Sequence, residues 1–91
     1  MEIKFIGWCF DPKRNHDKVW GIGDVGNDEH MSFWGRRGKR LQTHTKYMDE
    51  YEAAGLIDSK LAKGYQEFDK DDLDQIHDDF AKELFIVYLK T

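Results

Sequence analysis

The chain has 91 residues and a net charge of −4 at neutral pH, a length that suits one domain and excludes two separate cores. A single cysteine, Cys9, excludes an internal disulfide, and no apolar run approaches the roughly 20 residues that a membrane span requires. The N-terminus has no signal-peptide pattern, so we expect a soluble protein of the reducing cytoplasm.

Charge is unevenly distributed along the sequence. Residues 1–46 contain nine Lys or Arg and six Asp or Glu, a net charge of +3, whereas residues 47–91 contain five and twelve, a net charge of −7. Because salt screens charges beyond about 8–10 Å, one basic face can bind phosphate despite the acidic total. A solvated surface without a ligand gives the same pattern, so charge alone leaves both interpretations open.

The first two predicted elements are strands. Residues 2–10 carry apolar side chains on both faces, so we expect this strand to be covered on both sides. A polar loop follows over 11–17, where the only proline ends the strand. Residues 18–25 form the second predicted strand, in which Trp20 and Ile22 share a face.

The glycines at the end of the second strand match a nucleotide-binding pattern. Residues 21–26 spell Gly-x-Gly-x-x-Gly, whose third glycine opens a phosphate-binding helix in dinucleotide-binding folds. Here Asn27 and Asp28 follow, which are typical of a turn, and another strand comes next. The segment is therefore predicted to be a strand end and a hairpin turn.

The third predicted strand covers residues 30–37. Alternate side chains point to opposite faces, with Met31, Phe33 and Gly35 on one and Ser32, Trp34 and Arg36 on the other. Serine and arginine suit water, so parity places Trp34 on the wetter face beside Arg36. An indole there can stack on a sugar or base while the cation meets a phosphate. Alternatively, Trp34 packs beneath the stem of Arg36 or Arg40.

A fourth strand and a helix are predicted next. Gly38 permits a tight turn, and the strand over 39–46 continues the basic surface. Helical spacing predicts an amphipathic helix over 47–63, which stops at Gly64. Its apolar stripe is predicted to be Tyr47, Tyr51, Ala54, Ile57 and Leu61.

The remaining residues predict a short strand over 65–68 and a second helix beginning at Asp69. The apolar stripe of this helix is Leu73, Ile76, Phe80, Leu84 and Val87. Its last turns are apolar all round, so that end is either deeply buried or shared with another chain. The aspartates over 69–74 lack the spacing of a calcium loop and are read as helix-capping anions.

A family resemblance rests on the stretch around Trp34. The triplet Trp34-Gly35-Arg36, followed by Gly38 and Gln42, resembles the signature of the WGR domain. This domain occurs in poly(ADP-ribose) polymerases and in bacterial proteins related to a molybdate-metabolism regulator.

Two further pieces extend the resemblance over residues 2–69. Lys18-Val19-Trp20 is similar to the strand before the triplet, and Lys60 with Lys63-Gly64-Tyr65 is similar to the end of the family's helix. Leu41 departs from the pattern, because the family usually has a second glycine before the glutamine. We therefore expect the turn between the third and fourth strands to differ.

The expected fold is α+β, with an antiparallel sheet of four or five strands packed on one helix. Residues 1–69 would form a WGR-like domain, and residues 70–91 an added C-terminal helix packed on the same domain. Polymerase WGR domains engage DNA near a break, where the triplet tryptophan meets the sugar at the strand end. The resemblance implies that role for Trp34 and a non-catalytic module that binds nucleic acid, with DNA expected, without sequence preference.

The expected nucleic-acid-binding residues are Trp34, Arg36, Arg37, Lys39, Arg40, Gln42, Lys13 and Arg14. The cations would contact phosphates, although the triplet arginine of the polymerases reaches a neighbouring domain, so a protein contact for Arg36 stays open. Gln42 would brace the turn. Lys13 and Arg14, on the first loop, would extend the basic surface.

No motif in the sequence indicates catalysis. The four histidines are scattered, Cys9 has no Cys-x-x-Cys partner, and neither a Walker A sequence nor a Gly-x-Ser-x-Gly elbow is present. We expect no enzyme activity, metal, cofactor, small-molecule substrate or membrane contact. The alternative function is a protein-interaction or homodimerisation module that uses the WGR face and the apolar C-terminal helix. A structural role without a ligand also stays open.

Overall fold

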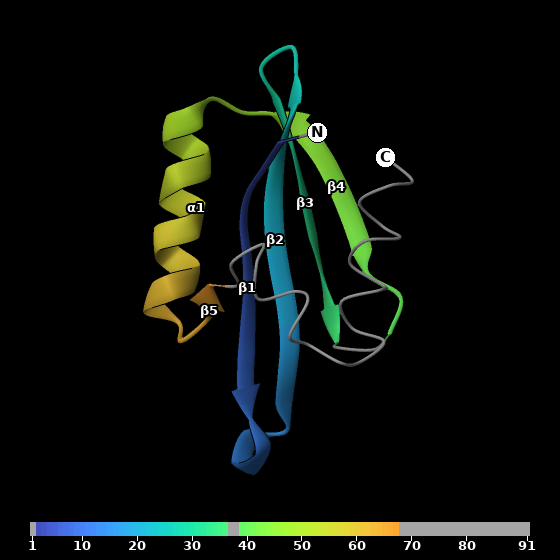
Figure 1. Cartoon of the computed structure of the whole chain (residues 1–91), viewed down its shortest axis with the longest axis vertical. Helices are drawn as coiled ribbons and strands as arrows, with labels where there is room; N and C mark the ends of the chain where they lie inside the picture. The colour runs from blue at the N-terminus through green and yellow to red at the C-terminus, as the bar shows by residue number, and fades with distance from the viewer. Residues whose placement is uncertain (1, 37–38, 68–91) are drawn as a thin grey trace.

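The computed structural model describes residues 2–36 and 39–67 of the chain (Figure 1). They form an antiparallel five-stranded sheet and one α-helix, which confirms the predicted α+β class. The elements are β1 (Glu2–Asp11), the short 3-10 helix η1 (Pro12–Arg14), β2 (His16–Gly26), β3 (Glu29–Arg36), β4 (Gln42–Tyr47), α1 (Glu50–Ala62) and β5 (Gln66–Glu67). The predicted C-terminal helix over 70–91 lies outside the described residues.

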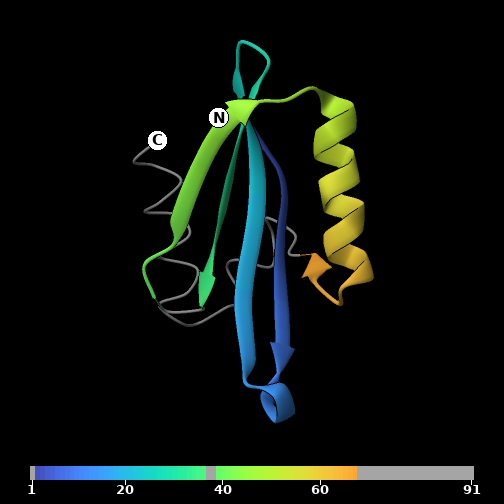
Figure 2. The same cartoon turned by 180° about the vertical axis from the view of Figure 1, so that it is seen from behind.

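The strand order is β4-β3-β2-β1-β5, so the sequence neighbours β1 to β4 form a meander and β5 returns beside β1. The helix α1 lies on the β1 and β5 side of the sheet, away from β4, in both views (Figures 1 and 2). No helix in the part of the chain that the structure describes has the length and apolar character needed to cross a membrane.

The turn between β2 and β3 confirms the hairpin prediction. Asn27 and Asp28 have φ angles of 55° and 60°, and Gly26 pairs with Glu29 across the turn. Positive φ at both central residues is the geometry of a type I′ hairpin, which Asn and Asp tolerate well. The carboxylate of Asp24 accepts a hydrogen bond from the Gly26 N–H at 2.8 Å. A strand therefore follows the glycines directly, as predicted.

Apolar side chains lie on both faces of the sheet. One face, the helix face, carries Phe5, Trp20, Ile22, Met48 and Ala53, with Trp34, Ile57 and Tyr65 packed against them. The opposite face carries Ile6, Val19, Met31, Phe33 and Leu41, with Ile3 packed against them. Both clusters include residues of β1, which confirms that this strand buries side chains on both sides.

Capping interactions define the ends of α1. The N-cap Asp49 accepts a hydrogen bond from the Glu52 N–H at 2.8 Å. Gly64 has a φ of +98°, and the Tyr65 N–H bonds to the Lys60 carbonyl oxygen at 3.1 Å. This bond is the long hydrogen bond of a Schellman motif, so the predicted stop at Gly64 is confirmed.

The predicted apolar stripe of the helix is wrong in part, because Ile57 packs toward the sheet as predicted whereas its other members are exposed. Tyr47 belongs to β4 and is 73% exposed, and Tyr51, in the first turn of α1, is 91% exposed. Ala53, which was not in the predicted stripe, faces the sheet together with Ile57. Ala53 is buried in the cluster that also contains Phe5 and Ile22, and a small side chain there lets the helix pack closely on these large residues.

Candidate nucleic-acid interface

Strand register places Trp34 in the middle of three strands on the helix face. It lies opposite Trp20 of β2 and opposite Gln42 of β4. Ser32 lies opposite Ile22, and Arg36 lies opposite Lys18. Both residues are two positions from Trp34 along β3, so all three lie on one face of the sheet, as predicted.

The face of the sheet that carries Trp34 is less exposed to solvent than the sequence predicted. Trp34 is half-buried, because it packs against the cluster that contains Trp20 and Ile22. The side chain nevertheless keeps an exposed part, since α1 lies toward β1 and β5 and not over β4 (Figure 2). The interface therefore has a partly exposed indole at the margin of a core, not a ring that stands free in water.

Arg36 is anchored by neutral groups. Its two terminal nitrogens donate to the carbonyl oxygen and the side-chain oxygen of Asn15 at 3.3 and 3.4 Å. Asn15 follows η1 and has a φ of 56°. Among the residues that the structure describes, no carboxylate pairs with Arg36. The guanidinium is thus oriented by the β1–β2 connection, and no carboxylate of the described ranges compensates its charge.

The other predicted cations lie at the same end of the sheet. Lys13 and Arg14 are exposed in η1, and the Arg14 Nε lies 3.7 Å from Asp11, an exposed ion pair of small energetic value. Lys39 and Arg40 are exposed in the connection that follows β3. The predicted site residue Arg37 and the predicted turn residue Gly38 lie outside the described residues.

Leu41, the departure from the family pattern, is a core residue of the opposite face. A Cβ placed on Gly35 would lie 3.1 Å from the Leu41 Cδ2, and Gly35 has a φ of +156°. The glycine of the triplet therefore leaves space for Leu41 to close over β3. Because Leu41 turns inward, β4 begins at Gln42 and not at the predicted residue 39.

Three lysines that were not predicted as site residues also lie at the end of the sheet that carries Arg36. Lys18 lies opposite Arg36, and the Lys60 Nζ lies 5.4 Å from the ring centre of Trp20. Burial lowers the pKa of Lys60, and the positive charges of Lys63 and Lys18 lower it further, so the three ammonium groups are electrostatic neighbours. In the sequence, Lys18, Lys60 and Lys63 belong to the pieces that carry the family resemblance, and their types and spacing alone do not mark them as site residues.

The basic end of the sheet is defined by the described cations Lys13, Arg14, Lys18, Arg36, Lys39, Arg40, Lys60 and Lys63. Carboxylates also lie near this end, among them Glu67 of β5, which is opposite Gly7, the β1 partner of Trp20. Asp11 pairs with Arg14, and Asp17 accepts a hydrogen bond from the Trp8 indole nitrogen at 3.1 Å. Neither of these described contacts neutralises Lys18 or the lysines of α1.

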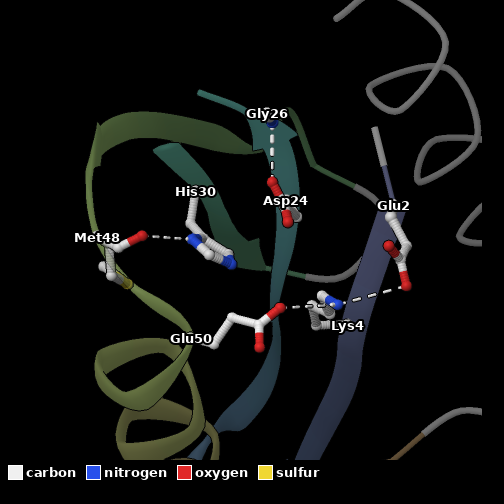
Figure 3. A network of polar contacts seen from close by, with 7 residues as sticks. All are labelled: Glu2, Lys4, Asp24, Gly26, His30, Met48 and Glu50. Carbon is white, nitrogen blue, oxygen red and sulfur yellow. Dashed lines mark hydrogen bonds and ion pairs between the residues drawn. The ribbon is translucent and has the colours of Figure 1, made fainter. Parts of the chain in front are cut away.

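The acidic end, at the other end of the sheet, comprises Glu2, Asp24, Asp28, Glu29, Asp49, Glu50 and Glu52. Here Lys4 bridges Glu2 and Glu50 at 3.3 and 3.9 Å (Figure 3). Each end draws residues from both halves of the sequence. The charge separation expected between the halves thus becomes a separation along the length of the sheet.

His30 connects β3 to the start of α1 at the acidic end. It is 3% exposed, and its Nδ1 donates to the Met48 carbonyl oxygen at 2.9 Å, because a carbonyl can only accept (Figure 3). The Met48 N–H donates to the Asp28 carbonyl oxygen at 2.9 Å. The His30 Nε2 has no hydrogen-bond partner among the described residues. Within the same ranges, no three His, Cys, Asp or Glu side chains are grouped to hold a metal ion.

Comparisons with models of known protein families, with curated proteins and with solved structures found no match for this chain. The resemblance to the WGR domain therefore rests on the quoted motif residues.

Proposed function

We propose that the basic end is a non-catalytic nucleic-acid-binding surface that contacts the backbone of DNA. The observation that carries the proposal is the position of Trp34, whose partly exposed indole lies beside Arg36, a cation without a carboxylate partner among the described residues. A base or sugar on this indole would contribute about 1–3 kcal/mol by stacking, and the guanidinium would meet the adjoining phosphate.

The remaining predicted residues extend this surface in two directions. Gln42 lies opposite Trp34 on β4, and Lys39 and Arg40 precede it in the β3–β4 connection. Lys13 and Arg14 lie beyond Asn15, which holds the Arg36 side chain. All of these groups would contact phosphate or sugar, which positions a protein on DNA without reading its sequence. We therefore propose binding without sequence preference.

The separation of charge supports the proposal for an acidic chain. Since exposed charges beyond about 8–10 Å are screened at physiological salt, the acidic end does not cancel the attraction of the basic end for phosphate. We further propose that residues 1–69 form a WGR-like domain, to which residues 70–91 add a C-terminal helix. The motif residues Trp34, Gly35 and Arg36 support this assignment.

The test is a fluorescence-anisotropy titration of labelled nicked, blunt and single-stranded oligonucleotides at two salt concentrations. If about four phosphates of duplex DNA are neutralised, log K should fall with log salt at a slope near about −3.6. Replacing Arg36 and Arg40 by Glu together should abolish binding, because both changes invert charge at the basic end. Lys46→Glu, on the exposed β4 strand near the acidic end, is the control with one charge inverted.

Flat titrations for all three oligonucleotides would overturn the proposal. The protein-interaction alternative would then be tested by light scattering of the full chain. A change of mass on replacing Phe85 and Val87 by Asp would support that alternative, which assigns those residues to an interface between chains.

A further inference from the structure

Lys60 lies between two aromatic rings where α1 ends. Its Nζ is 5.4 Å from the ring centre of Trp20 and 5.7 Å from that of Tyr65. Both distances are within the roughly 6 Å range of cation–π attraction, so the rings restrict where the ammonium group lies. Lys60 is thus a positioned cation, unlike a surface lysine that samples many rotamers.

Two other lysines, Lys63 and Lys18, place positive charge near the ammonium group of Lys60. Burial and the charges of Lys63 and Lys18 lower the pKa of Lys60, and no described carboxylate forms an ion pair with any of these lysines. Holding like charges together without a counter-ion costs free energy in the folded state. A bound anion would offset this cost, because it stabilises the charged form of each lysine.

Lys18 and Lys60 flank Trp34 on the side away from β4. Trp34 lies opposite Trp20, over which Lys60 is held, and Arg36 lies opposite Lys18. Gln42 adjoins Trp34 from the other side. The partly exposed indole therefore has the β3–β4 connection on one side and the lysines of β2 and α1 on the other.

We propose that Lys18 and Lys60 form a second phosphate subsite, so that a bound nucleic-acid strand crosses Trp34 from the β3–β4 connection to the end of α1. This inference rests on the proposed nucleic-acid binding and adds the direction of the strand. Adjacent strands lie about 4.8 Å apart, so β2 and β4 are separated by about 10 Å. At about 3.4 Å per stacked nucleotide, that distance corresponds to about three nucleotides.

The first test measures the salt dependence of single-strand binding for the full chain. Lys18→Gln and Lys60→Gln should each weaken binding several-fold and reduce the slope of log K against log salt by about 0.7. Lys46→Gln, near the acidic end, should leave affinity and slope unchanged. A strand of about twelve nucleotides should bind more tightly than one of about two, which is too short to reach both sets of cations.

The outcomes separate this inference from the proposed function. If the unmodified protein binds no oligonucleotide, the proposed function fails and the subsite fails with it. If Arg36→Glu with Arg40→Glu abolishes binding while both lysine variants keep the original slope, nucleic-acid binding stands and the second subsite is refuted.

A second measurement does not depend on removing Lys60, whose contacts with Trp20 and Tyr65 also support the fold. The pKa of the Lys60 ammonium group, followed by NMR of its Cε, should rise when a saturating oligonucleotide is added, because a phosphate stabilises the charged form. A pKa that does not move on saturation would refute the subsite. Lys60→Arg keeps the charge and should restore the slope that Lys60→Gln loses.

Discussion

Trp20 and Trp34 lie directly opposite each other on β2 and β3, yet only Trp20 is buried, at 6% exposed. The helix α1 passes over Trp20 and not over the neighbouring strand edge, so one indole belongs to the core and the other to its margin. This pair can therefore separate an effect on stability from an effect on the proposed binding.

Replacing each tryptophan by alanine should give opposite results. Trp20→Ala should lower the free energy of unfolding by about 3–5 kcal/mol, because it leaves a large cavity under α1. Trp34→Ala should lower stability less and weaken oligonucleotide binding by about 1–3 kcal/mol. Urea unfolding and anisotropy titration measure the two effects. Unchanged binding by a folded Trp34→Ala protein would exclude the indole from the interface.

Gly21→Ala should destabilise the fold by about 1–3 kcal/mol, as overpacking does. A Cβ at Gly21 would lie 2.1 Å from the Cζ of Phe33, and Phe33 is buried on the opposite face of the sheet. The ring would have to move within a packed cluster. Urea unfolding gives the size of the loss, and a variant as stable as the parent protein would show that this ring has room to shift.

The same substitution at Gly55 should have the opposite sign. Gly55 lies in the middle of α1, where an added Cβ meets nothing within 4 Å. Alanine is favoured over glycine in a helix interior by about 0.5–1 kcal/mol, so Gly55→Ala should raise the free energy of unfolding by that amount. A loss of stability measured by urea unfolding would mean that the outer face of α1 has a contact there.

Asp49→Ala should lower the free energy of unfolding by about 1 kcal/mol, because the Glu52 N–H loses its acceptor at the first turn. Asp58→Ala, an exposed change in the middle of α1, removes the same charge without a cap and is the control. Equal thermal midpoints for the two variants would show that the cap contributes nothing.

Alkaline pH should destabilise the fold through Tyr65. Burial, and then the nearby Cys9 thiolate, raise the pKa of the Tyr65 hydroxyl above its ordinary value of about 10. The folded state keeps the proton after the unfolded chain has lost it. The stability linked to Tyr65 is therefore complete below the unfolded pKa and is lost as the pH rises through the folded pKa.

Tyr65→Phe should remove this alkaline loss, measured as the urea midpoint between about pH 9 and 11. Lys60 contributes with the opposite sign, because its lowered pKa means that the unfolded chain binds more protons just below the ordinary lysine value. Stability in the Tyr65→Phe protein should therefore rise slightly with pH over that window. The same alkaline loss in both proteins would place its origin elsewhere.

The strands were predictable because alternation is a local signal. The alternating faces of β3 and the turn at Asn27 and Asp28 follow from the order of a few adjacent residues. The buried face of α1 was not predictable in this way. Helical spacing allows a stripe of Ile57 with Tyr51 and Leu61 as well as a stripe of Ile57 with Ala53. The choice between them depends on the cluster of Phe5, Trp20 and Ile22, which β1 and β2 bring under the helix from distant parts of the sequence.

Some residues of the candidate site could likewise be predicted from local sequence, and others could not. Trp34 and Arg36 could be found together because they are neighbours on one strand. Lys18 and Lys60 could not be joined to them by spacing alone, because register between β2 and β3 and the path of α1 bring them to that place. Long-range pairing of this kind carries no signature within a short stretch of sequence.

Among the residues that the structure describes, positive and negative side chains collect at opposite ends of the sheet, which gives this part of the chain an electric moment along the strands. Near a polyanion this moment exerts a torque that turns the positive pole forward before contact. Productive collisions then become more frequent at low ionic strength, and added salt slows arrival by removing that alignment.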